Sequence, residues 1–275
     1  MRLYEWAFSH PAPLREVLRR IIGKLKLGSY EFRLRIGALP RPNYAYIMYE
    51  AARLAQKLGV ARISVIEFGV AGGNGLVAME RHAEAIERLF DLKIEIYGFD
   101  TGGGLPEPGD YRDLPYHWQA GFFSMDRDAL MRKLSRARLI LGDVADTWEK
   151  FLRRDDPAPI AAVSHDFDFY SSTMAGLKLF EAAAHRLMPR VFCYFDDTIG
   201  SEEELYSQFS GQRLAIEDFN RSGSKRRIGI PYYLRIKQAL GIWVNQIWIL
   251  HVIDHEKYNA FIGEKDQSLP LLEAD

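Results

Sequence analysis

The sequence predicts an α/β fold, a doubly wound and mostly parallel sheet that follows a helical N-terminal arm. Three observations predict it. Short apolar runs rich in β-branched residues alternate with helical patterns from residue 43 onward, which is the order of a parallel sheet. A glycine-rich turn follows the first of these runs. Acidic residues follow later runs, at the strand ends where sheets of this kind bind ligands.

The composition indicates a globular domain that works in a reducing compartment. The chain has 275 residues, 48% hydrophobic, and a formal net charge of -1, so nothing in its overall charge points to nucleic acid. Its one cysteine, Cys193, stands in an apolar run and is expected to be buried. No disulfide within one chain is then available, and the first residues lack a signal-peptide pattern. We therefore expect a cytoplasmic location.

Residues 1–42 form a basic amphipathic arm that differs from the domain expected over 43–275. Apolar residues recur at helical spacing, at Leu14, Val17, Leu18, Ile21, Ile22 and Leu25. Seven basic residues surround them: Arg15, Arg19, Arg20, Lys24, Lys26, Arg33 and Arg35. We expect the apolar side to pack on the domain, to cover the mouth of the active site, or to join a homo-oligomer. Membrane association is the less favoured interpretation of this pattern.

The remaining elements are predicted in chain order from periodicity, glycine and proline. Helices are expected over 43–59, 75–90, 126–137, 144–153, 171–187 and 202–220. Strands are expected over 63–68, 93–99, 139–141, 160–163, 190–195 and 241–253. Residues 101–125 lack a periodic pattern and contain several glycines, prolines and aromatics. Because this segment follows a strand end, we expect a lid or a wall of the substrate site, with Tyr111, Tyr116 and Trp118 as shielding aromatics.

The glycine-rich turn indicates a cofactor site. Glycine permits positive φ and a close approach of the backbone to a ligand. The dinucleotide fingerprint is broken, because Ala71 stands where its second glycine would be, and the lysine of a phosphate loop is absent. The remaining pattern, Glu67, Gly69 and Gly73, resembles the first motif of methyltransferases that use S-adenosylmethionine (SAM). A turn that only packs the following helix on the sheet is the alternative.

Two further strand ends carry single aspartates. Asp100 ends the strand at 93–99 and is placed to accept hydrogen bonds from ribose hydroxyls. Asp143, after Gly142, is placed to bind an adenine amino group. Either aspartate also suits the cap of a loop or a helix. The sequence leaves both interpretations open.

Paired aspartates indicate a cation site. Asp166 and Asp168 follow one buried strand, and Asp196 and Asp197 follow the next. Neighbouring strands lie about 4.8 Å apart, so these carboxylates converge if the two strands pair. Clustered carboxylates raise one another's pKa or need a cation, and oxygen ligands suit Mg²⁺, Ca²⁺ or Mn²⁺. Two unrelated helix caps are the alternative. His165 is either a proton acceptor or a space-filling core residue.

Four blocks in order resemble the macrocin O-methyltransferase family of SAM-dependent enzymes. They begin at Glu67, Tyr97, Asp166 and Asp196 and read EFGVAGG, YGFDT with GLP, DFDFYSST and DD. The resemblance covers about residues 60–200 and implies a seven-stranded Rossmann-like sheet and a divalent cation. It also implies methylation of hydroxyls, often on sugars of natural products. The segment 101–104 departs from the family pattern.

The resemblance assigns roles to residues of this chain. It implies that Asp166, Asp196 and Asp197 bind the metal and that Asp166 is a general base. The predicted SAM-binding residues are Glu67, Gly69, Val70, Gly73, Asp100, Thr101, Gly142, Asp143 and Asp166, and the predicted catalytic residues are Asp166 and His165. The resulting hypothesis is SAM-dependent, Mg²⁺-dependent O-methylation of a small polyhydroxylated or glycosylated acceptor. A nucleotide-dependent oxidoreductase and a non-catalytic SAM-binding protein are the alternatives.

Overall fold

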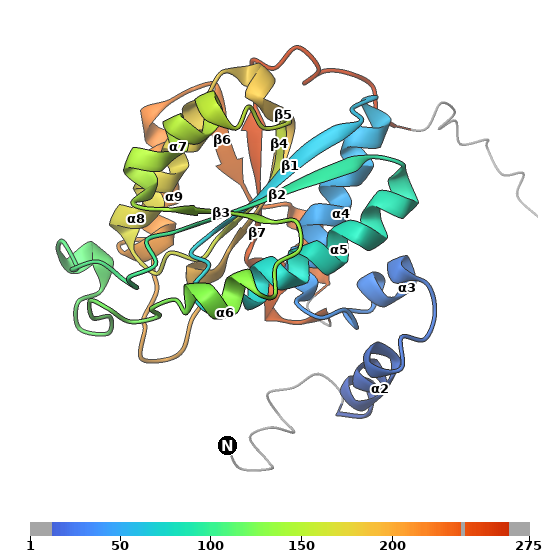
Figure 1. Ribbon diagram of the computed structural model, residues 1–275, viewed down its shortest axis with the longest axis horizontal. Coiled ribbons are helices and arrows are strands. Elements are labelled where there is room, and N and C mark those ends of the chain that lie inside the picture. The colour runs from blue at the N-terminus through green and yellow to red at the C-terminus, as the bar shows by residue number, and fades with distance from the viewer. Residues whose placement is uncertain (1–12, 238–239, 264–275) are drawn as a thin grey trace, which may run out of the picture.

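One mixed sheet forms the centre of the protein, as Figure 1 shows. The computed structural model describes residues 13–237 and 240–263. Within them, seven strands run in the order β3-β2-β1-β4-β5-β7-β6. The first five are parallel, and β7 runs antiparallel between β5 and β6. Their bounds are β1 Arg62–Phe68, β2 Lys93–Asp100, β3 Arg138–Leu141, β4 Ile160–His165, β5 Leu187–Phe195, β6 Arg226–Gly229 and β7 Ile247–Val252. The predicted doubly wound, mostly parallel sheet is confirmed.

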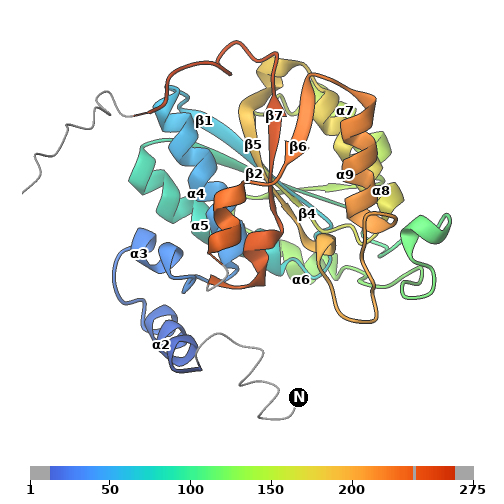
Figure 2. The same cartoon turned by 180° about the vertical axis from the view of Figure 1, so that it is seen from behind.

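Helices cover both faces of this sheet, which explains the apolar runs in the sequence (Figure 2). Every residue of β4 is buried, as is every residue of β1 after Arg62. Strands covered on both faces read as continuous apolar runs. One hydrophobic cluster includes α4 Pro42–Lys57 and α5 Asn74–Phe90. The other includes α7 Val144–Arg154, α8 Tyr170–Leu177 and α9 Gly211–Ser222.

Three predicted helices are shorter than expected. Helix α6 covers only Arg127–Met131, because the amides of residues 135–137 donate to the Glu80 carboxylate and not to helical carbonyls. Helix α8 ends at Leu177, where a 3₁₀ turn begins. Helix α9 begins at Gly211, whose φ of 57° is left-handed. A periodic apolar pattern carries no information about these competing local hydrogen bonds.

The C-terminal strands also differ from the prediction. The expected strand over 241–253 begins only at Ile247, since the 3₁₀ turn η7 Ile242–Asn245 precedes it. Strand β6 was not predicted. It has four residues, lies at the edge of the sheet, and ends before Pro231. Short edge strands followed by proline leave a weak periodic signal.

The arm contains helix α2 Pro13–Lys24 and the short helix α3 Tyr30–Arg35, and α3 was not predicted. The expectation that the apolar side of α2 packs on the domain is wrong. Leu14, Leu18 and Leu25 are 81%, 55% and 62% exposed. None of the described helices is both long and apolar enough to span a membrane.

Candidate active site

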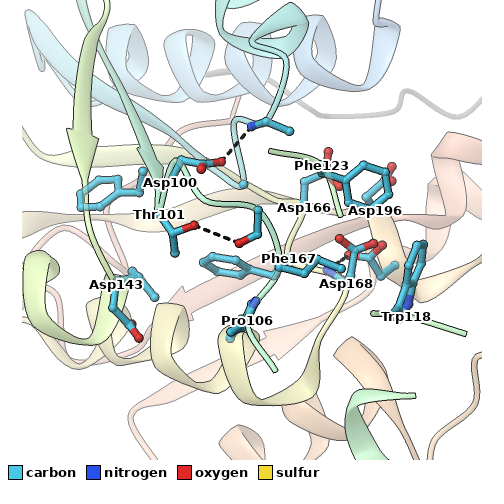
Figure 3. Close-up of a pocket in the computed structure, with 18 of the residues that line it drawn as sticks. Asp100, Thr101, Pro106, Trp118, Phe123, Asp143, Asp166, Phe167, Asp168 and Asp196 are labelled. Carbon is cyan, nitrogen blue, oxygen red and sulfur yellow. Dashed lines mark hydrogen bonds between the residues drawn. The ribbon is translucent and has the colours of Figure 1, made fainter. Parts of the chain in front are cut away.

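The carboxyl ends of the parallel strands surround one cavity of about 350 Å³. Figure 3 shows Asp100, Thr101 and Asp143 at one end, and Asp166, Asp168 and Asp196 at the other. Phe167 lies between the two groups. The lining residues are Gly69, Ala71, Phe99, Asp100, Thr101, Gly104, Leu105, Pro106, Trp118, Phe123, Gly142, Asp143, Val144, Asp166, Phe167, Asp168, Ser172, Asp196, Asp197 and Glu204. The cavity therefore joins the predicted cofactor site to the predicted metal site.

The glycine turn after β1 brings two strand ends into close contact. Gly69 has a φ of 76°, and a Cβ there would lie 1.7 Å from the Asp166 carbonyl oxygen. Gly73 has a φ of 77° and caps helix α5. Gly69 lines the cavity, whereas Val70 and Gly73 support the turn from outside it. Ala71 also adopts a left-handed φ of 44°.

Glu67 lies on β1 just before the glycine turn and does not line the cavity. Its Oε1 accepts a hydrogen bond from the Tyr44 hydroxyl at 2.7 Å. Its buried Oε2 has no partner among the described residues. A Cβ at Gly75 would lie 1.7 Å from Oε1, so glycine is required beside this carboxyl group. Burial raises the pKa of Glu67 to about 7, although the Tyr44 hydroxyl and the Arg41 charge lower it.

Glu67 should make stability depend on pH. Its pKa rises from 4.5 to about 7 on folding, so the native state holds a proton that the unfolded state has lost. The contribution of Glu67 to the free energy of unfolding is therefore full below pH 4.5 and is lost as pH rises to about 7. The expected loss is about 3 kcal/mol. Urea unfolding across this range should show a shallower decline for Glu67→Gln than for wild type. Parallel curves would contradict the assignment.

At the end of the cavity predicted to bind the cofactor, Asp100 and Thr101 form hydrogen bonds that fix the neighbouring loops. Asp100 Oδ2 accepts from the Ala71 amide at 2.8 Å, and Oδ1 accepts from the Gly102 amide at 2.6 Å. The Thr101 hydroxyl donates to the Gly104 carbonyl at 3.0 Å. Both residues line the cavity. Asp100 thus connects the glycine turn to the end of β2.

Asp143 combines the two roles that the sequence left open. Its Oδ1 accepts from the Ala145 amide at 2.8 Å and caps helix α7. The residue also lines the cavity beside Gly142, which has a φ of 124°. A helix cap and a position at the ligand site are therefore compatible here.

The three predicted metal ligands lie together. Asp166, Asp196 and Asp197 each offer a carboxylate oxygen, and these atoms lie within 4.8 Å of one another. This follows from the pairing of β4 with β5, in which His165 is opposite Phe195. The chain turns into a 3₁₀ conformation at Asp196, so consecutive aspartates both line the cavity.

The acidic cluster has raised pKa values. Burial, followed by the charges of Asp196 and Asp197, raises the pKa of Asp166 well above its usual range. Burial and the Asp168 charge do the same for Asp197. Burial and the Asp166 charge raise the pKa of Asp168 to about 8. Asp168 also has a left-handed φ of 60°, and its amide donates to Asp197 Oδ2 at 2.9 Å.

Two glutamine side chains brace the ends of β4 and β5, and no sequence pattern had indicated them. Gln212 accepts from the Asp197 amide at 2.9 Å and donates to the His165 carbonyl at 3.3 Å. Gln246 donates to the Asp196 carbonyl. Both glutamines stand far from the aspartates in sequence, so only the folded arrangement identifies them.

His165 lies outside the cavity, in an aromatic core. It is completely buried and stacks on Phe195, with ring centroids 4.3 Å apart. Neither ring nitrogen has a partner among the described residues. Burial lowers its pKa to about 3. The geometry fits the space-filling interpretation and does not place the ring where it would reach a ligand in the cavity.

The segment 101–125 forms a wall of the cavity, as expected. Trp118 lines it, but Tyr111 and Tyr116 are 69% and 63% exposed and do not. Phe123 and Glu204, which the sequence did not single out, complete the wall. Asp113 anchors the segment, since its carboxylate accepts from the Ser171 amide at 2.8 Å and from its hydroxyl at 2.9 Å.

Solved methyltransferase structures match this chain at low sequence identity. CalS11, a calicheamicin methyltransferase, is 23% identical over 76% of this chain and 85% of that chain, with a TM-score of 0.47. The O-methyltransferase NovP is 14% identical over 76% and 90%, with a TM-score of 0.49. The mycinamycin-pathway methyltransferase MycE, in complex with Mg, SAH and mycinamycin VI, is 15% identical over 74% and 48%, with a TM-score of 0.40. No protein-family model and no curated protein sequence matches the chain.

Proposed function

We propose that this protein is a SAM-dependent O-methyltransferase that requires a divalent cation. The observation that carries the proposal is a single cavity that joins a glycine turn to a cluster of three aspartates. The four sequence blocks that resemble the macrocin O-methyltransferases contribute residues to this cavity or to its supports. The proposed acceptor is a hydroxyl of a small polyhydroxylated or glycosylated molecule.

The donor would occupy the end of the cavity between Gly69 and Asp143. The left-handed turn at Gly69 lets the backbone approach the ligand. Asp100 lines this end and would accept hydrogen bonds from the ribose hydroxyls, as carboxylates do at this position in other nucleotide-binding sheets. Phe99 and Val144 supply apolar surface for the adenine ring, and Asp143 lies next to Val144 for a polar contact. Val70, Gly73 and Glu67 would keep the turn in shape without touching the donor.

The other end fits a divalent cation. Asp166, Asp196 and Asp197 provide only oxygen ligands, the set that Mg²⁺, Ca²⁺ and Mn²⁺ prefer. Burial, followed by the charges of neighbouring aspartates, raises the pKa of Asp166 and Asp197, so the cluster is electrostatically unfavourable without positive charge. A Mg²⁺ held by these residues would supply charge that favours the ionised form of an acceptor hydroxyl.

The reaction would be an in-line displacement at the sulfonium methyl group. The acceptor oxygen forms a bond to the methyl carbon while the carbon–sulfur bond breaks, and sulfur keeps the electron pair. The product is S-adenosylhomocysteine (SAH) with a methyl ether. Since the sulfonium already activates the methyl group, the protein mainly aligns donor and acceptor. Trp118 and Phe123 would exclude water from the cavity.

An aspartate of the cluster would take the acceptor proton. Asp166 lies in the cavity, but as a proposed metal ligand it has one role already. Asp168 lines the same cavity and stands outside the three-ligand group, so metal binding would not occupy its carboxylate. We therefore assign proton transfer to Asp168, with Asp166 as the second candidate. His165 takes no part in this scheme, because it lies outside the cavity.

Calorimetric titration of SAM and SAH, with and without Mg²⁺, tests the proposal. We expect micromolar binding, the usual range for an enzyme substrate. Incubation with methyl-labelled SAM and a panel of nucleotide sugars and glycosylated natural products should then yield a labelled ether. Binding of NAD without SAM would favour the oxidoreductase. SAM binding without transfer to any acceptor would favour the non-catalytic alternative.

A further inference from the structure

Helix α2 turns its apolar side away from the domain. Leu14, Val17, Leu18 and Ile21 are 81%, 48%, 55% and 46% exposed. The opposite side of the helix contacts the rest of the protein through a glycine and an arginine. A Cβ at Gly23 would lie 2.4 Å from the Ala38 carbonyl oxygen, and Arg19 donates to the Leu240 carbonyl at 2.7 Å. A helix that packs on its own domain buries the apolar side, so this arrangement is reversed.

A second segment adds apolar surface at this attachment. The 3₁₀ turn η5 Tyr232–Ile236 exposes Tyr232 by 76% and Ile236 by 86%, and Ile242 is 62% exposed. Leu240, which accepts the Arg19 hydrogen bond, stands between Ile236 and Ile242 in the chain. We call the exposed apolar residues of α2 the arm surface, and Tyr232, Ile236 and Ile242 are a separate exposed apolar group near the Leu240 contact.

The arm surface is also basic. Residues 13–36 contain seven lysines or arginines and two glutamates, a net charge of +5, whereas the whole chain has a net charge of -1. Glu16 is already paired with Arg19 and Arg20. On the second segment, the Arg235 guanidinium lies 5.2 Å from the Tyr232 ring centroid, and the Lys237 ammonium lies 5.3 Å from that of Tyr233. Exposed cations therefore border the apolar side chains in both segments.

We propose that the arm surface binds the interface of an anionic membrane. The apolar side chains of α2 enter the boundary between headgroups and acyl chains, while the flanking cations contact lipid phosphates. With 12 residues, α2 is too short to span a bilayer and lies in its plane. Charge complementarity selects this partner. Two arms packed against each other would bring two charges of +5 together, whereas an anionic lipid surface neutralises them.

Vesicle flotation of the full chain tests this inference. Wild type should float with vesicles of phosphatidylcholine and phosphatidylglycerol, less so at high salt, and should not float with phosphatidylcholine alone. The double variant Leu18→Glu, Ile21→Glu should lose at least about tenfold in apparent affinity. Leu89→Glu is the matched control, because Leu89 is an exposed helical leucine on α5, at 44% exposure. It should bind as wild type does.

Three results would overturn the inference. One is wild type that does not float with anionic vesicles. Another is a double variant that floats as well as Leu89→Glu. The third is a wild-type dimer in light scattering that the double variant converts to a monomer, without any binding to vesicles. Because these residues are exposed, the variants should keep the wild-type melting temperature, and SAM titration of the same samples reports separately on the cavity.

Discussion

Replacing Asp196 by asparagine is expected to abolish the response of the protein to Mg²⁺ and to make the protein without cation more stable. The carboxylate oxygens of Asp166, Asp196 and Asp197 lie within 4.8 Å of one another. Two unit charges at that distance repel by about 3 kcal/mol at an effective dielectric constant of 20. Asparagine keeps the volume and removes one of three charges, so it lowers both the repulsion within the cluster and the attraction of the cluster for a cation.

Thermal unfolding measures both effects without knowledge of the acceptor. Wild type should gain melting temperature with Mg²⁺, since a ligand that binds only the native state stabilises it. Asp196→Asn should have a higher melting temperature than wild type without Mg²⁺, and adding Mg²⁺ should not raise it further. Asp128→Asn removes an exposed carboxylate of α6 that does not line the cavity, and it should respond as wild type does. An equal Mg²⁺ response in all three proteins would remove the cation from the mechanism.

The same variant separates the cavity into its two ends. SAM affinity of Asp196→Asn should remain within about threefold of wild type, because the proposed donor contacts lie at the glycine turn and the end of β2. Labelled methyl transfer should fall by about 100-fold or more, as expected when a metal that activates the nucleophile is lost. A parallel loss of SAM affinity would show that the two ends are not independent.

The parts of the site that the sequence predicted are those fixed by strand order. Each β-strand ends where its apolar run ends, and parallel strands end at one edge of the sheet. The convergence of Asp166 with Asp196 therefore followed from two local patterns and one assumption, that β4 and β5 are neighbours, which the structure confirms. The glycine turn was predictable because its glycines are close together in sequence, although the contact that excludes a side chain at Gly69 comes from Asp166, on another strand end.

The parts that escaped prediction depend on contacts between distant segments. Gln212 and Gln246 brace the acidic strand ends across 15 and 50 positions of sequence, and an isolated glutamine carries no local signal. Glu80 ends helix α6 from another helix, 55 positions away. The outward side of α2 is the clearest case. Its periodicity predicted the helix correctly, but periodicity does not determine which side meets the domain.

Gly69→Ala is expected to lose SAM affinity by about 100-fold and to destabilise the fold. The new Cβ would lie 1.7 Å from the Asp166 carbonyl oxygen, a backbone atom that cannot rotate away. The φ of 76° adds a cost of about 1–2 kcal/mol for a residue with a Cβ, and overpacking adds about 1–3 kcal/mol. The ends of β1 and β4 must separate to accept the methyl group, which opens the donor end of the cavity. Urea unfolding and SAM calorimetry measure the two losses.

Gly72→Ala is the matched control, because it lies in the same turn with only the Asn74 side chain, at 3.9 Å, near its added Cβ. Gly72→Ala should lower the free energy of unfolding by less than about 1 kcal/mol and keep SAM affinity.

Asp100→Ala tests the same end of the cavity without the backbone clash, since Asp100 lines the cavity and accepts from the Ala71 amide. It should weaken SAM binding in a protein that remains folded. If Gly69→Ala and Asp100→Ala both bind SAM as wild type does, the turn only packs helix α5 on the sheet and the donor site lies elsewhere.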